Sequence, residues 1–471
     1  MHRSIAIIGA GFSGTATAVH LLARHGELPL TIALINRHAS LGRGVAYGTH
    51  SPSHLLNVPA GRMSLFPDRE NDFLEFAYRR DNAVTAASFV PRSLYGEYLH
   101  ARLDAAAAQA PKMRLTIMTG EVTALNLEHH YAVLDFADRR QLQADRVVLA
   151  VGNYPPSNPP VPDHGVIASG RYVRDPWSPG ALDDIPMDRP VLLIGTGHTM
   201  VDMALELDRR GFRASLMALS RRGLLPQPHR DQPARTQLPP PAELFAGPAS
   251  IHHYLRSVHA AVKKGTQHDH DWRDVVAALR PVTQALWQAL PDAERRRFLR
   301  HLQPYWDTHR HRTAPATATR LHALRASGHL QIRAGRLLEL RPGGNDIDVR
   351  WQPRGHTLSE QFHVACVINC TGPETRLNRL SDPLICNLLA QKLLTPDRLG
   401  LGVAINSEGA AFDGTSQASH VIYYTGPLLR ARDWECTAVP ELRVAALRLA
   451  DHLALSSVTD NPTDSHDKLS P

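Results

Sequence analysis

Three glycines near the start of the chain have the spacing that holds the phosphates of a dinucleotide. The pattern Gly9-Ala10-Gly11-Phe12-Ser13-Gly14 directly follows a short apolar run at residues 4–8. The first glycine permits a tight turn from strand to helix, the second lets a pyrophosphate approach the backbone, and the third allows close helix–strand packing. The N-terminus of the following helix offers free N–H groups to the phosphates. Because a strand precedes the pattern and a helix follows it, we predict a dinucleotide site rather than an ordinary turn.

A looser copy of this pattern occurs in the middle of the chain. The apolar run 191–194 leads into Gly195-Thr196-Gly197-His198-Thr199-Met200, where Met200 replaces the third glycine. The next apolar run, 214–219, ends in Ser220-Arg221-Arg222. A cation at this position favours the 2′-phosphate of NADPH, although an arginine can also stack on adenine. Two such units in one chain predict a flavin and a nicotinamide held face to face for hydride transfer.

Other residues around the first pattern are candidates for contact with FAD. The predicted strand 30–37 carries Asn36 where a dinucleotide fold usually has an acid for the ribose, and an amide can still bond a hydroxyl. The segments 41–49 and 55–64 could wrap the pyrophosphate and the flavin edge, with Arg43 or Arg62 near phosphates, or could be surface turns. Arg92 could meet a phosphate or be a solvated arginine at a helix start. The residues predicted to bind the two cofactors are Gly9, Gly11, Ser13, Gly14, Asn36, Arg37, Arg43, Asn57, Arg92, Val122, Gly152, Gly195, Gly197, His198, Thr199, Met200, Ser220, Arg221, Arg222, Gly372, Gly426 and Pro440.

Basic residues in the middle of the chain are candidates for binding an anionic substrate. His309, Arg310 and Arg312 close a helical segment, and His229 follows a Leu-Pro pair. The alternative is a basic helix end that only compensates the helix dipole. The chain has 27 histidines, so chance pairs are expected, and without acidic or cysteine partners at ligand spacing they predict no metal site. No catalytic side chain can be assigned, since no Ser-His-Asp set stands out.

The elements that position these residues predict an α/β fold with two Rossmann-like dinucleotide-binding domains, a small β-meander and a helical insertion. We expect the first part of the FAD-binding domain at residues 1–180 and its second part at 329–455. The NAD(P)-binding domain is expected at 186–328, with the helical insertion at about 250–315. The runs 115–125 and 131–137 are expected to be meander strands, and 456–471 a disordered tail. The helix of the C-terminal segment starts near Pro440, and its dipole would stabilise negative charge on a reduced flavin.

Composition restricts the partners. Lys and Arg number 52 against 45 Asp and Glu, and they are spread among the acids, which favours anionic cofactors or substrates over nucleic acid. The cysteines at 366, 370, 386 and 436 form no Cys-x-x-Cys pair, so a thioredoxin-type redox pair and a zinc ribbon are not supported. No signal-peptide layout and no long apolar run are present, so we expect a cytoplasmic protein without a membrane span. Oligomeric state is not predicted.

Six motifs together resemble the bacterial FAD/NAD(P)-binding flavoprotein family, which is distantly similar to two-dinucleotide flavin monooxygenases. They occur in order along nearly the whole chain: Gly-Ala-Gly-Phe-Ser-Gly at 9–14, Gly-Arg-Gly-Val-Ala-Tyr at 42–47, Leu-Leu-Asn-Val-Pro-Ala at 55–60, Gly-Thr-Gly-His-Thr-Met-Val-Asp at 195–202, Asn-Cys-Thr-Gly-Pro at 369–373 and Val-Pro-Glu-Leu-Arg at 439–443. Within that family the chain most resembles the flavoprotein urate hydroxylases. The clearest departure from the usual FAD pattern is Asn36.

The resemblance implies an FAD-dependent monooxygenase that uses NAD(P)H and oxygen. It would hydroxylate a small anionic substrate through a C4a-hydroperoxide of the flavin, with conversion of urate to 5-hydroxyisourate in purine catabolism as the favoured reaction. Alternatives are an NAD(P)H-dependent flavin reductase or electron-transfer protein, and an N-hydroxylating monooxygenase of an amine or amino acid. A non-catalytic nucleotide-binding module of a complex is a further alternative and would not oxidise NAD(P)H.

Overall fold

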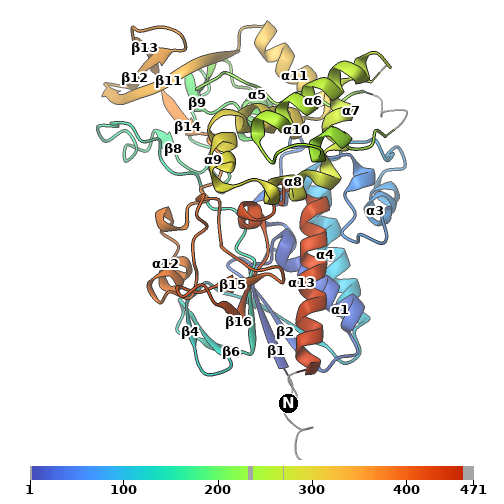
Figure 1. Ribbon diagram of the computed structural model, residues 1–471. Coiled ribbons are helices and arrows are strands. Elements are labelled where there is room, and N and C mark those ends of the chain that lie inside the picture. The colour runs from blue at the N-terminus through green and yellow to red at the C-terminus, as the bar shows by residue number, and fades with distance from the viewer. Residues whose placement is uncertain (1–2, 232–236, 269, 460–471) are drawn as a thin grey trace, which may run out of the picture.

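Two mainly parallel β-sheets form the frame of the protein in the computed structural model, which describes residues 3–231, 237–268 and 270–459 (Figure 1). The first sheet has the order β15-β16-β7-β1-β2-β3, and each neighbouring pair is parallel except β15 with β16. Its strands are β1 Arg3–Ile8, β2 Leu30–Asn36, β3 Arg114–Thr119, β7 Arg146–Leu149, β15 Ala410–Phe412 and β16 Ala418–Tyr424. The apolar run of the first glycine pattern therefore lies in the middle of this sheet.

The helix that follows the first glycine pattern, α1 (Phe12–His25), packs against both α4 (Arg92–Ala108) and α13 (Val439–Thr459), and the three lie side by side (Figure 1). Side chains of the first sheet and of these helices share one large apolar core. Shorter helices in the same part of the chain are α2 Gly44–Tyr47, the 3₁₀ turn η1 Ala60–Arg62 and α3 Asp72–Arg80.

The second sheet repeats the arrangement of the first. Its order is β13-β12-β11-β10-β9-β14-β8, with parallel pairs from β11 to β8 and antiparallel pairs from β11 to β13. Its strands are β8 Tyr172–Val173, β9 Val191–Ile194, β10 Leu216–Ser220, β11 Leu330–Gly343, β12 Asp346–Pro353, β13 Glu360–Val364 and β14 Cys366–Asn369. The helices α5 His198–Arg209 and α11 Pro315–Ala326 contact each other.

Alternate residues of β9 enter different apolar clusters, because successive strand side chains point to opposite sheet faces. Val191 and Leu193 belong to one cluster, and Leu192 and Ile194 to the other. The second sheet is therefore buried on both faces, as a parallel sheet in an α/β protein must be.

A small antiparallel sheet and a group of helices complete the fold. The small sheet consists of β4 Val122–Leu127, β5 Ala132–Phe136 and β6 Gln141–Ala144, and α12 (Pro383–Ala390) packs on β4. The helical insertion contains α6 Ile251–Thr266, α7 Trp272–Ala278, α8 Thr283–Ala289, α9 Asp292–His301 and α10 Gln303–Arg310. Further 3₁₀ turns are η2 Ala242–Phe245, η3 Arg280–Val282, η4 Leu377–Arg379 and η5 Pro427–Ala431.

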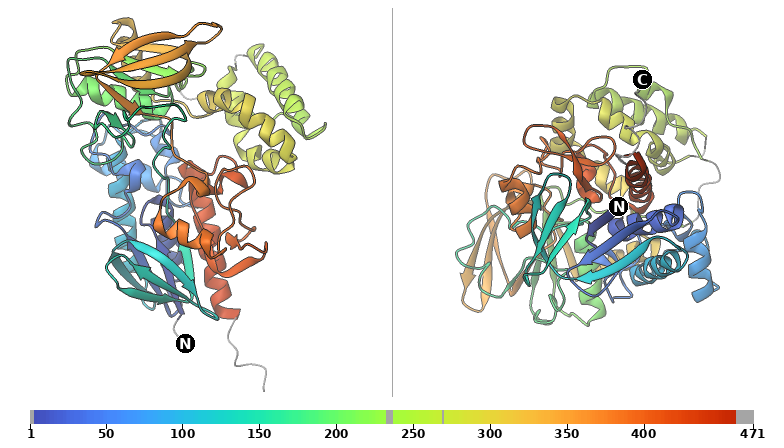
Figure 2. Two further views of the ribbon diagram at one scale, coloured as in Figure 1. Left: turned by 90° about the vertical axis from the view of Figure 1, so that its left-hand side faces the viewer. Right: turned by 90° about the horizontal axis from the view of Figure 1, so that it is seen from below.

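The helical insertion stands to one side of the second sheet, above the N-terminal end of α13 (Figure 2, left). It is fixed there by aromatic packing on the segment that leads into α13. The Trp287 ring stacks on Trp434 with centroids 4.6 Å apart, and its indole N–H donates to the carbonyl oxygen of Ala431 at 2.8 Å. Trp287 is buried by these contacts.

Three predictions about the elements are corrected by the structure. Residues 115–119 do not join the meander, since β3 pairs in parallel with β2 as the edge of the first sheet. Strands between residues 330 and 369 belong to the second sheet, whereas the predicted boundary at 328/329 assigned them to the FAD-binding domain. Residues 456–459 continue α13, and the rest of the predicted tail, 460–471, lies outside the described residues. An apolar run marks a strand, but it does not say which sheet the strand joins.

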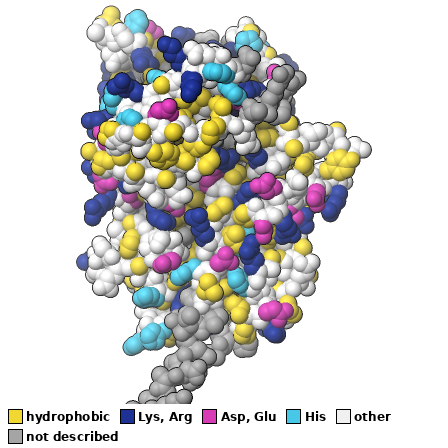
Figure 3. Space-filling view, turned by 45° about the vertical axis from the view of Figure 1, so that its right-hand side comes forward, with side chains coloured by type: hydrophobic (Ala, Val, Ile, Leu, Met, Phe, Trp, Pro, Cys, Tyr) yellow, Lys and Arg dark blue, Asp and Glu magenta, His cyan; other side chains and the backbone are white. Residues whose placement is uncertain are grey.

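Charges of both signs are mixed on the surface. Dark-blue basic side chains are spread over the face in Figure 3 and stand among acidic ones. Within the described residues, no helix combines the length and apolar character needed to cross a membrane.

Candidate functional site

The first glycine turn, residues 9–14, has the shape that a dinucleotide needs, and we call it the first cradle. Gly9 has φ +109°, and a Cβ placed on it would lie 2.2 Å from the carbonyl oxygen of Ala150 at the end of β7. A Cβ on Gly14 would lie 1.8 Å from the carbonyl oxygen of Gly9, so helix and turn touch where glycine alone fits. Gly11 is the N-cap of α1 and has no side chain to satisfy the first N–H groups of the helix. These N–H groups can therefore bind an anion.

The segment after β2 closes against this turn. The N–H of Gly42 donates to the carbonyl oxygen of Ala10 at 2.9 Å, and Gly44 packs against Gly11. The Arg43 guanidinium between them has no hydrogen-bond or ion-pair partner in the described part of the chain, which leaves it free to bind a phosphate. From the other side, Gly426 approaches the hydroxyl of Ser13, which brings the segment before α13 to the turn.

Asn36 and Arg37, predicted to bind the ribose and adenine side, are held by the protein itself. The Asn36 amide donates to the carbonyl oxygens of His38 at 2.7 Å and Ser40 at 2.8 Å, and its oxygen accepts from the N–H of Ala10 at 3.4 Å. Asn36 thus shapes the turn. Arg37 pairs with the buried carboxylate of Asp382.

The remaining residues predicted near FAD occupy varied places. Val122 begins β4 and is buried, so only its backbone could contact an adenine. Gly152 and Gly372 follow β7 and β14 at equivalent points of the two sheets, and both have positive φ with open space where a Cβ would stand. Pro440 lies in the first turn of α13. Near the N-terminus of α13, Arg443 donates to the carbonyl oxygen of Ser64 at 2.9 Å, which ties this helix to the segment 55–64.

Arg92, predicted either to meet a phosphate or to be a solvated arginine at a helix start, is held by groups of the protein itself. Its guanidinium donates to both carboxylate oxygens of Asp202 on α5, at 2.9 and 3.1 Å, and to the carbonyl oxygen of Leu55 at 3.0 Å. Arg92 and Asp202 side chains are 14% and 7% exposed, so this is a nearly buried ion pair. It joins α4, which begins at Arg92, to α5, the helix that follows the second glycine turn.

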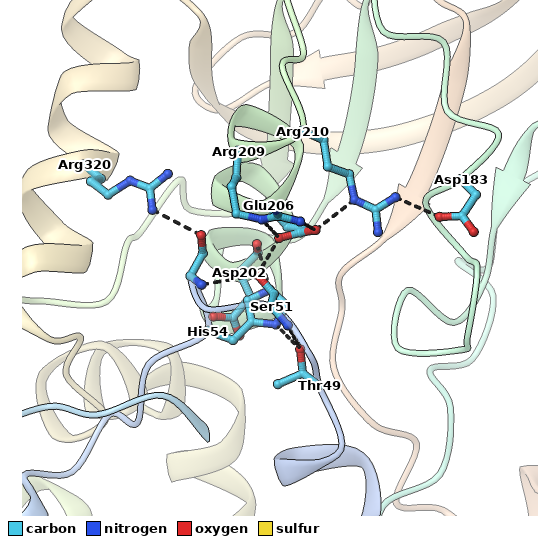
Figure 4. A network of polar contacts seen from close by, with 10 residues as sticks. Thr49, Ser51, His54, Asp183, Asp202, Glu206, Arg209, Arg210 and Arg320 are labelled. Carbon is cyan, nitrogen blue, oxygen red and sulfur yellow. Dashed lines mark hydrogen bonds and ion pairs between the residues drawn. The ribbon is translucent and has the colours of Figure 1, made fainter. Parts of the chain in front are cut away.

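A second polar network links the same two parts (Figure 4). Ser51, on the segment after the first cradle, donates its hydroxyl to the buried carboxylate of Glu206 on α5. Arg209 and Arg210 both donate to that carboxylate, at 2.7 to 2.9 Å. The hydrogen bond from Arg209 is the largest cause that lowers the pKa of Glu206 to about 2, and the bonds from Arg210 and Ser51 lower it further. The bond from Ser51 and the Arg92–Asp202 ion pair thus connect α5 to the first part of the chain.

The second glycine turn, residues 195–200, has the same backbone arrangement as the first, and we call it the second cradle. Gly195 has φ +111°, and a Cβ on it would lie 2.5 Å from the carbonyl oxygen of Cys370 at the end of β14. Gly197 is the exposed N-cap of α5, with no atom within 4 Å of a Cβ position. The structure therefore provides a second set of free helix N–H groups for phosphates.

The side chains of two residues predicted at this turn are engaged within the protein. Met200 is completely buried in the apolar core beside the second sheet, so only its backbone could contact a cofactor. The imidazole of His198 donates from Nε2 to the carbonyl oxygen of His311 at 2.8 Å, and burial lowers its pKa to about 4, so it is neutral at pH 7. This bond ties the start of α5 to the end of the helical insertion. Thr199 is half-buried and has an unused hydroxyl among the described residues.

A hollow of about 260 Å³ at the end of β10 is lined by Arg221, Arg222 and Arg354. Arg222 donates to the carbonyl oxygen of Arg300 at 3.4 Å, whereas Arg221 and Arg354 have no acidic partner within the described ranges. The hydroxyl of Ser220 is taken by Thr196 at 2.8 Å. Three guanidinium groups give the hollow the charge that suits an anion, and it follows β10, where a dinucleotide fold recognises the 2′-substituent.

Sequence reasoning missed Arg354, since it comes from the turn after β12. Its N–H donates to the carbonyl oxygen of Ala334, and Ala334 pairs with Ser220 across β10 and β11. Only the register of three strands brings this arginine to the hollow.

A cluster of basic side chains lies at the junction of the two cradles, where the loop after β10 contacts the segment after the first cradle. His229 donates from Nε2 to the carbonyl oxygen of Asn57 at 2.9 Å, which fixes the loop after β10 against the segment after the first cradle. Burial, with nearby Arg312 as the next cause, lowers the His229 pKa to about 4. Arg312 lies beside this histidine, since the His229 backbone N–H donates to the carbonyl oxygen of Thr313 at 2.9 Å, and the segment that carries Arg62 is brought there by Asn57.

Of the four residues predicted to bind an anionic substrate, the structure brings His229 and Arg312 to this cluster. Arg310 is nearby but already pairs with Glu435 at 3.2 Å and Glu441 at 3.6 Å. His309 is bonded through Nδ1 to the carbonyl oxygen of Tyr305 at 2.8 Å. No group of His, Cys, Asp or Glu among the described residues has an arrangement that could hold a metal ion.

Comparison with known proteins agrees with the geometry of the first cradle. The model of a family described as FAD-NAD(P)-binding matches residues 6–154, about a third of the chain. The search of curated proteins found no match.

Solved structures share the fold over nearly the whole chain. L-lysine 6-monooxygenase from Pseudomonas syringae has a TM-score of 0.64 and 16% identity, over 97% of this chain and 100% of its own. The ornithine N-hydroxylase of Kutzneria sp. 744, with reduced FAD, NADP⁺ and L-ornithine, has a TM-score of 0.61 and 14% identity, over 97% and 100%. Thioredoxin reductase of T. acidophilum has a TM-score of 0.52 and 10% identity, over 97% and 100%. The prediction of an α/β fold with two dinucleotide-binding units is confirmed.

Proposed function

We propose that this chain is an NADPH-dependent flavin monooxygenase that hydroxylates a nitrogen of a small amine or amino acid. The observation that carries the proposal is the pair of equivalent glycine turns, at Gly9 and Gly195, each closed by the carbonyl oxygen that ends a neighbouring parallel strand. Ion pairs and hydrogen bonds from α5 to the first half of the molecule hold the two turns in a fixed relation. Such a scaffold can bind a flavin and a nicotinamide for direct hydride transfer.

The residues at each turn fit the proposed cofactor. FAD would lie on the first turn, with its pyrophosphate on the free N–H groups of α1 and beside Arg43, and its ring toward the N-terminus of α13. NADPH would lie on the second turn, with its 2′-phosphate among Arg221, Arg222 and Arg354. Bound FAD would supply the redox chemistry, accepting a hydride and activating oxygen once reduced. The chain's own part is to position both cofactors and exclude water.

The choice of an amine as substrate rests on likeness to the lysine and ornithine hydroxylases, which share the fold over their whole length. At 14–16% identity, the likeness supports a reaction type but does not identify a substrate. Urate hydroxylation, favoured by the family resemblance, has no support from these neighbours. Urate is therefore included in the assay as the competing substrate.

A disulfide reductase is the second candidate, because thioredoxin reductase shares the fold. The cysteines argue against it. Cys366, Cys370 and Cys436 are buried free thiols whose pKa values are raised by burial, and Cys386 is exposed but stands alone. A dithiol reductase needs two adjacent reactive thiols beside the flavin.

The proposal is tested on the purified protein with its bound flavin. We expect a yellow protein that oxidises NADPH faster when L-ornithine, L-lysine or another primary amine is added. Formation of the hydroxylamine should match the amine-dependent NADPH consumption. Consumption stimulated by urate, with loss of urate absorbance, would favour the competing reaction instead. A colourless protein that does not take up FAD would refute both.

A further inference from the structure

Two guanidinium groups near the junction of the cradles carry charge that no carboxylate balances. Arg62 is on η1, in the segment after the first cradle, and Arg312 follows α10. Within residues 3–231, 237–268 and 270–459, neither forms an ion pair or a side-chain hydrogen bond. The Arg312 Nε is fully buried and unpaired, although a buried donor ordinarily finds an acceptor. An unsatisfied buried guanidinium is expensive unless a ligand completes it.

The neighbouring arginines are different, because carboxylates hold each of them. Arg280 donates to both oxygens of Glu441 at 2.6 and 2.9 Å. Arg273 pairs with Asp271 at 2.9 Å, and Glu441 also lies 3.6 Å from Arg310. Asp271, Glu435 and Glu441 are therefore committed to other arginines.

The charges that act on the two free arginines are mainly positive. Burial is the first cause that lowers the pKa of Arg312, to about 10, followed by Arg310 and Arg273, with Asp271 opposing them. For Arg62, burial, Arg280 and Arg310 lower the pKa and Glu70 opposes them. Like charges held together in this way would be stabilised by a bound anion.

The surroundings of the pair suit a small organic ligand. The Trp272 ring lies with its centroid 6.0 Å from the Arg312 guanidinium carbon and offers an aromatic surface. His229 is neutral at pH 7, and because its Nε2–H is bonded to Asn57, its Nδ1 can accept a hydrogen bond from a ligand. Arg62 is surrounded by protein on one side but keeps an exposed surface, so a ligand can reach the cluster from solvent.

We propose that Arg62 and Arg312 bind the carboxylate of the substrate at the junction of the two cradles. The inference rests on the proposed function and refines it: the substrate is a carboxylate-bearing amine, and diamines are excluded. The location supports this, since the carbonyl oxygen of His311, next to Arg312, accepts the bond from His198 at the start of α5. Asn57, five residues before Arg62, is bonded to His229. The carboxylate would thus lie between elements of both cradles.

The test compares 5-aminopentanoate with cadaverine, which have five carbons each and differ in one end group. Binding to the FAD-loaded protein is measured by calorimetry without NADPH, so the result does not depend on turnover. We expect 5-aminopentanoate to bind and cadaverine to bind at least tenfold more weakly. A charge-assisted hydrogen bond corresponds to roughly 10- to 100-fold in affinity, so Arg312→Gln should remove most of the difference. Arg312→Lys should keep part of it.

Arg325→Gln is the matched control, because Arg325 is an exposed arginine at the end of α11 and belongs to neither glycine turn nor to the basic cluster. It should bind 5-aminopentanoate as the wild type does, and bound FAD in every variant verifies folding. Equal binding of the two probes, no binding of 5-aminopentanoate, or an unchanged Arg312→Gln variant would each overturn the subsite. Weaker NADPH binding in Arg312→Gln with unchanged 5-aminopentanoate binding would assign the arginine to a cofactor phosphate instead. Failure of the monooxygenase proposal would be seen separately, as absence of amine-dependent NADPH oxidation.

Discussion

The three-arginine hollow at the end of β10 predicts a specific preference for NADPH over NADH. Replacing Arg221 or Arg354 by alanine removes a cation that has no acidic partner in the described structure, so little else should be lost. Arg221→Ala and Arg354→Ala should therefore weaken NADPH binding and leave NADH binding unchanged, because NADH lacks the 2′-phosphate.

The size of the effect follows from exposure. Both arginines are exposed, and the hollow of about 260 Å³ is open to solvent. Contacts between exposed charges are worth about 1 kcal/mol each, at the low end for ionic hydrogen bonds. One substitution should thus raise the KM for NADPH roughly fivefold, and both together roughly 30-fold. Because such contacts are screened, the effect should shrink as salt rises from about 0.05 to 0.5 M.

The assay is steady-state oxidation of NADPH and of NADH by the wild type, the two single variants and the double variant. Arg325→Ala provides a control for loss of one positive charge elsewhere on the surface. Equal loss with both nucleotides would mean that the arginines act on the shared pyrophosphate. A wild type that prefers NADH would refute the assignment of the hollow.

Three further predictions concern folding and cofactor retention. Gly14→Ala should abolish FAD binding, measured by flavin absorbance, since its Cβ would lie 1.8 Å from a backbone oxygen. Gly197→Ala has open space around its Cβ, so it should keep FAD and only weaken NADPH binding, measured by titration. Arg92→Met should lower the free energy of unfolding by about 3–5 kcal/mol in urea titration, because it leaves the carboxylate of Asp202 buried and unpaired; a loss below about 1 kcal/mol would show that water reaches this pair. His20 is fully buried with both ring nitrogens unpartnered and a pKa lowered to about 4, so the unfolded chain binds its proton first and stability should fall by about 3 kcal/mol from pH 6.5 to pH 4. His20→Leu should flatten that decline, and an unchanged pH slope would assign the acid sensitivity to other groups.

The sequence predicted those parts of the site that depend on local backbone geometry. Gly9 and Gly195 adopt the positive φ that a strand-to-helix turn requires, and each contacts the end of a neighbouring parallel strand. Local spacing suffices here because the glycine, the turn and the helix start are adjacent in the chain. The equivalence of Gly14 and Met200 was misleading, because the spacing does not reveal how closely each helix approaches its turn. In the second unit the larger side chain fills the core beside the sheet.

Residues whose role depends on long-range pairing could not be assigned from the sequence. Arg92 begins a helix, as the sequence predicts, but its partner is 110 positions away on a different helix, so a phosphate contact and a buried ion pair have the same local pattern. Arg354 reaches the 2′-phosphate hollow through strand register alone. In the basic segment that closes the insertion, Arg310 and Arg312 are two positions apart, but Arg310 forms ion pairs and Arg312 forms none with the described residues. The acids that neutralise Arg310 come from the chain more than 120 residues later, at Glu435 and Glu441, and they leave Arg312 unpaired. A free charge at this junction is therefore a property of the assembled fold, and this is why substituting Arg312 should separate ligand binding from stability.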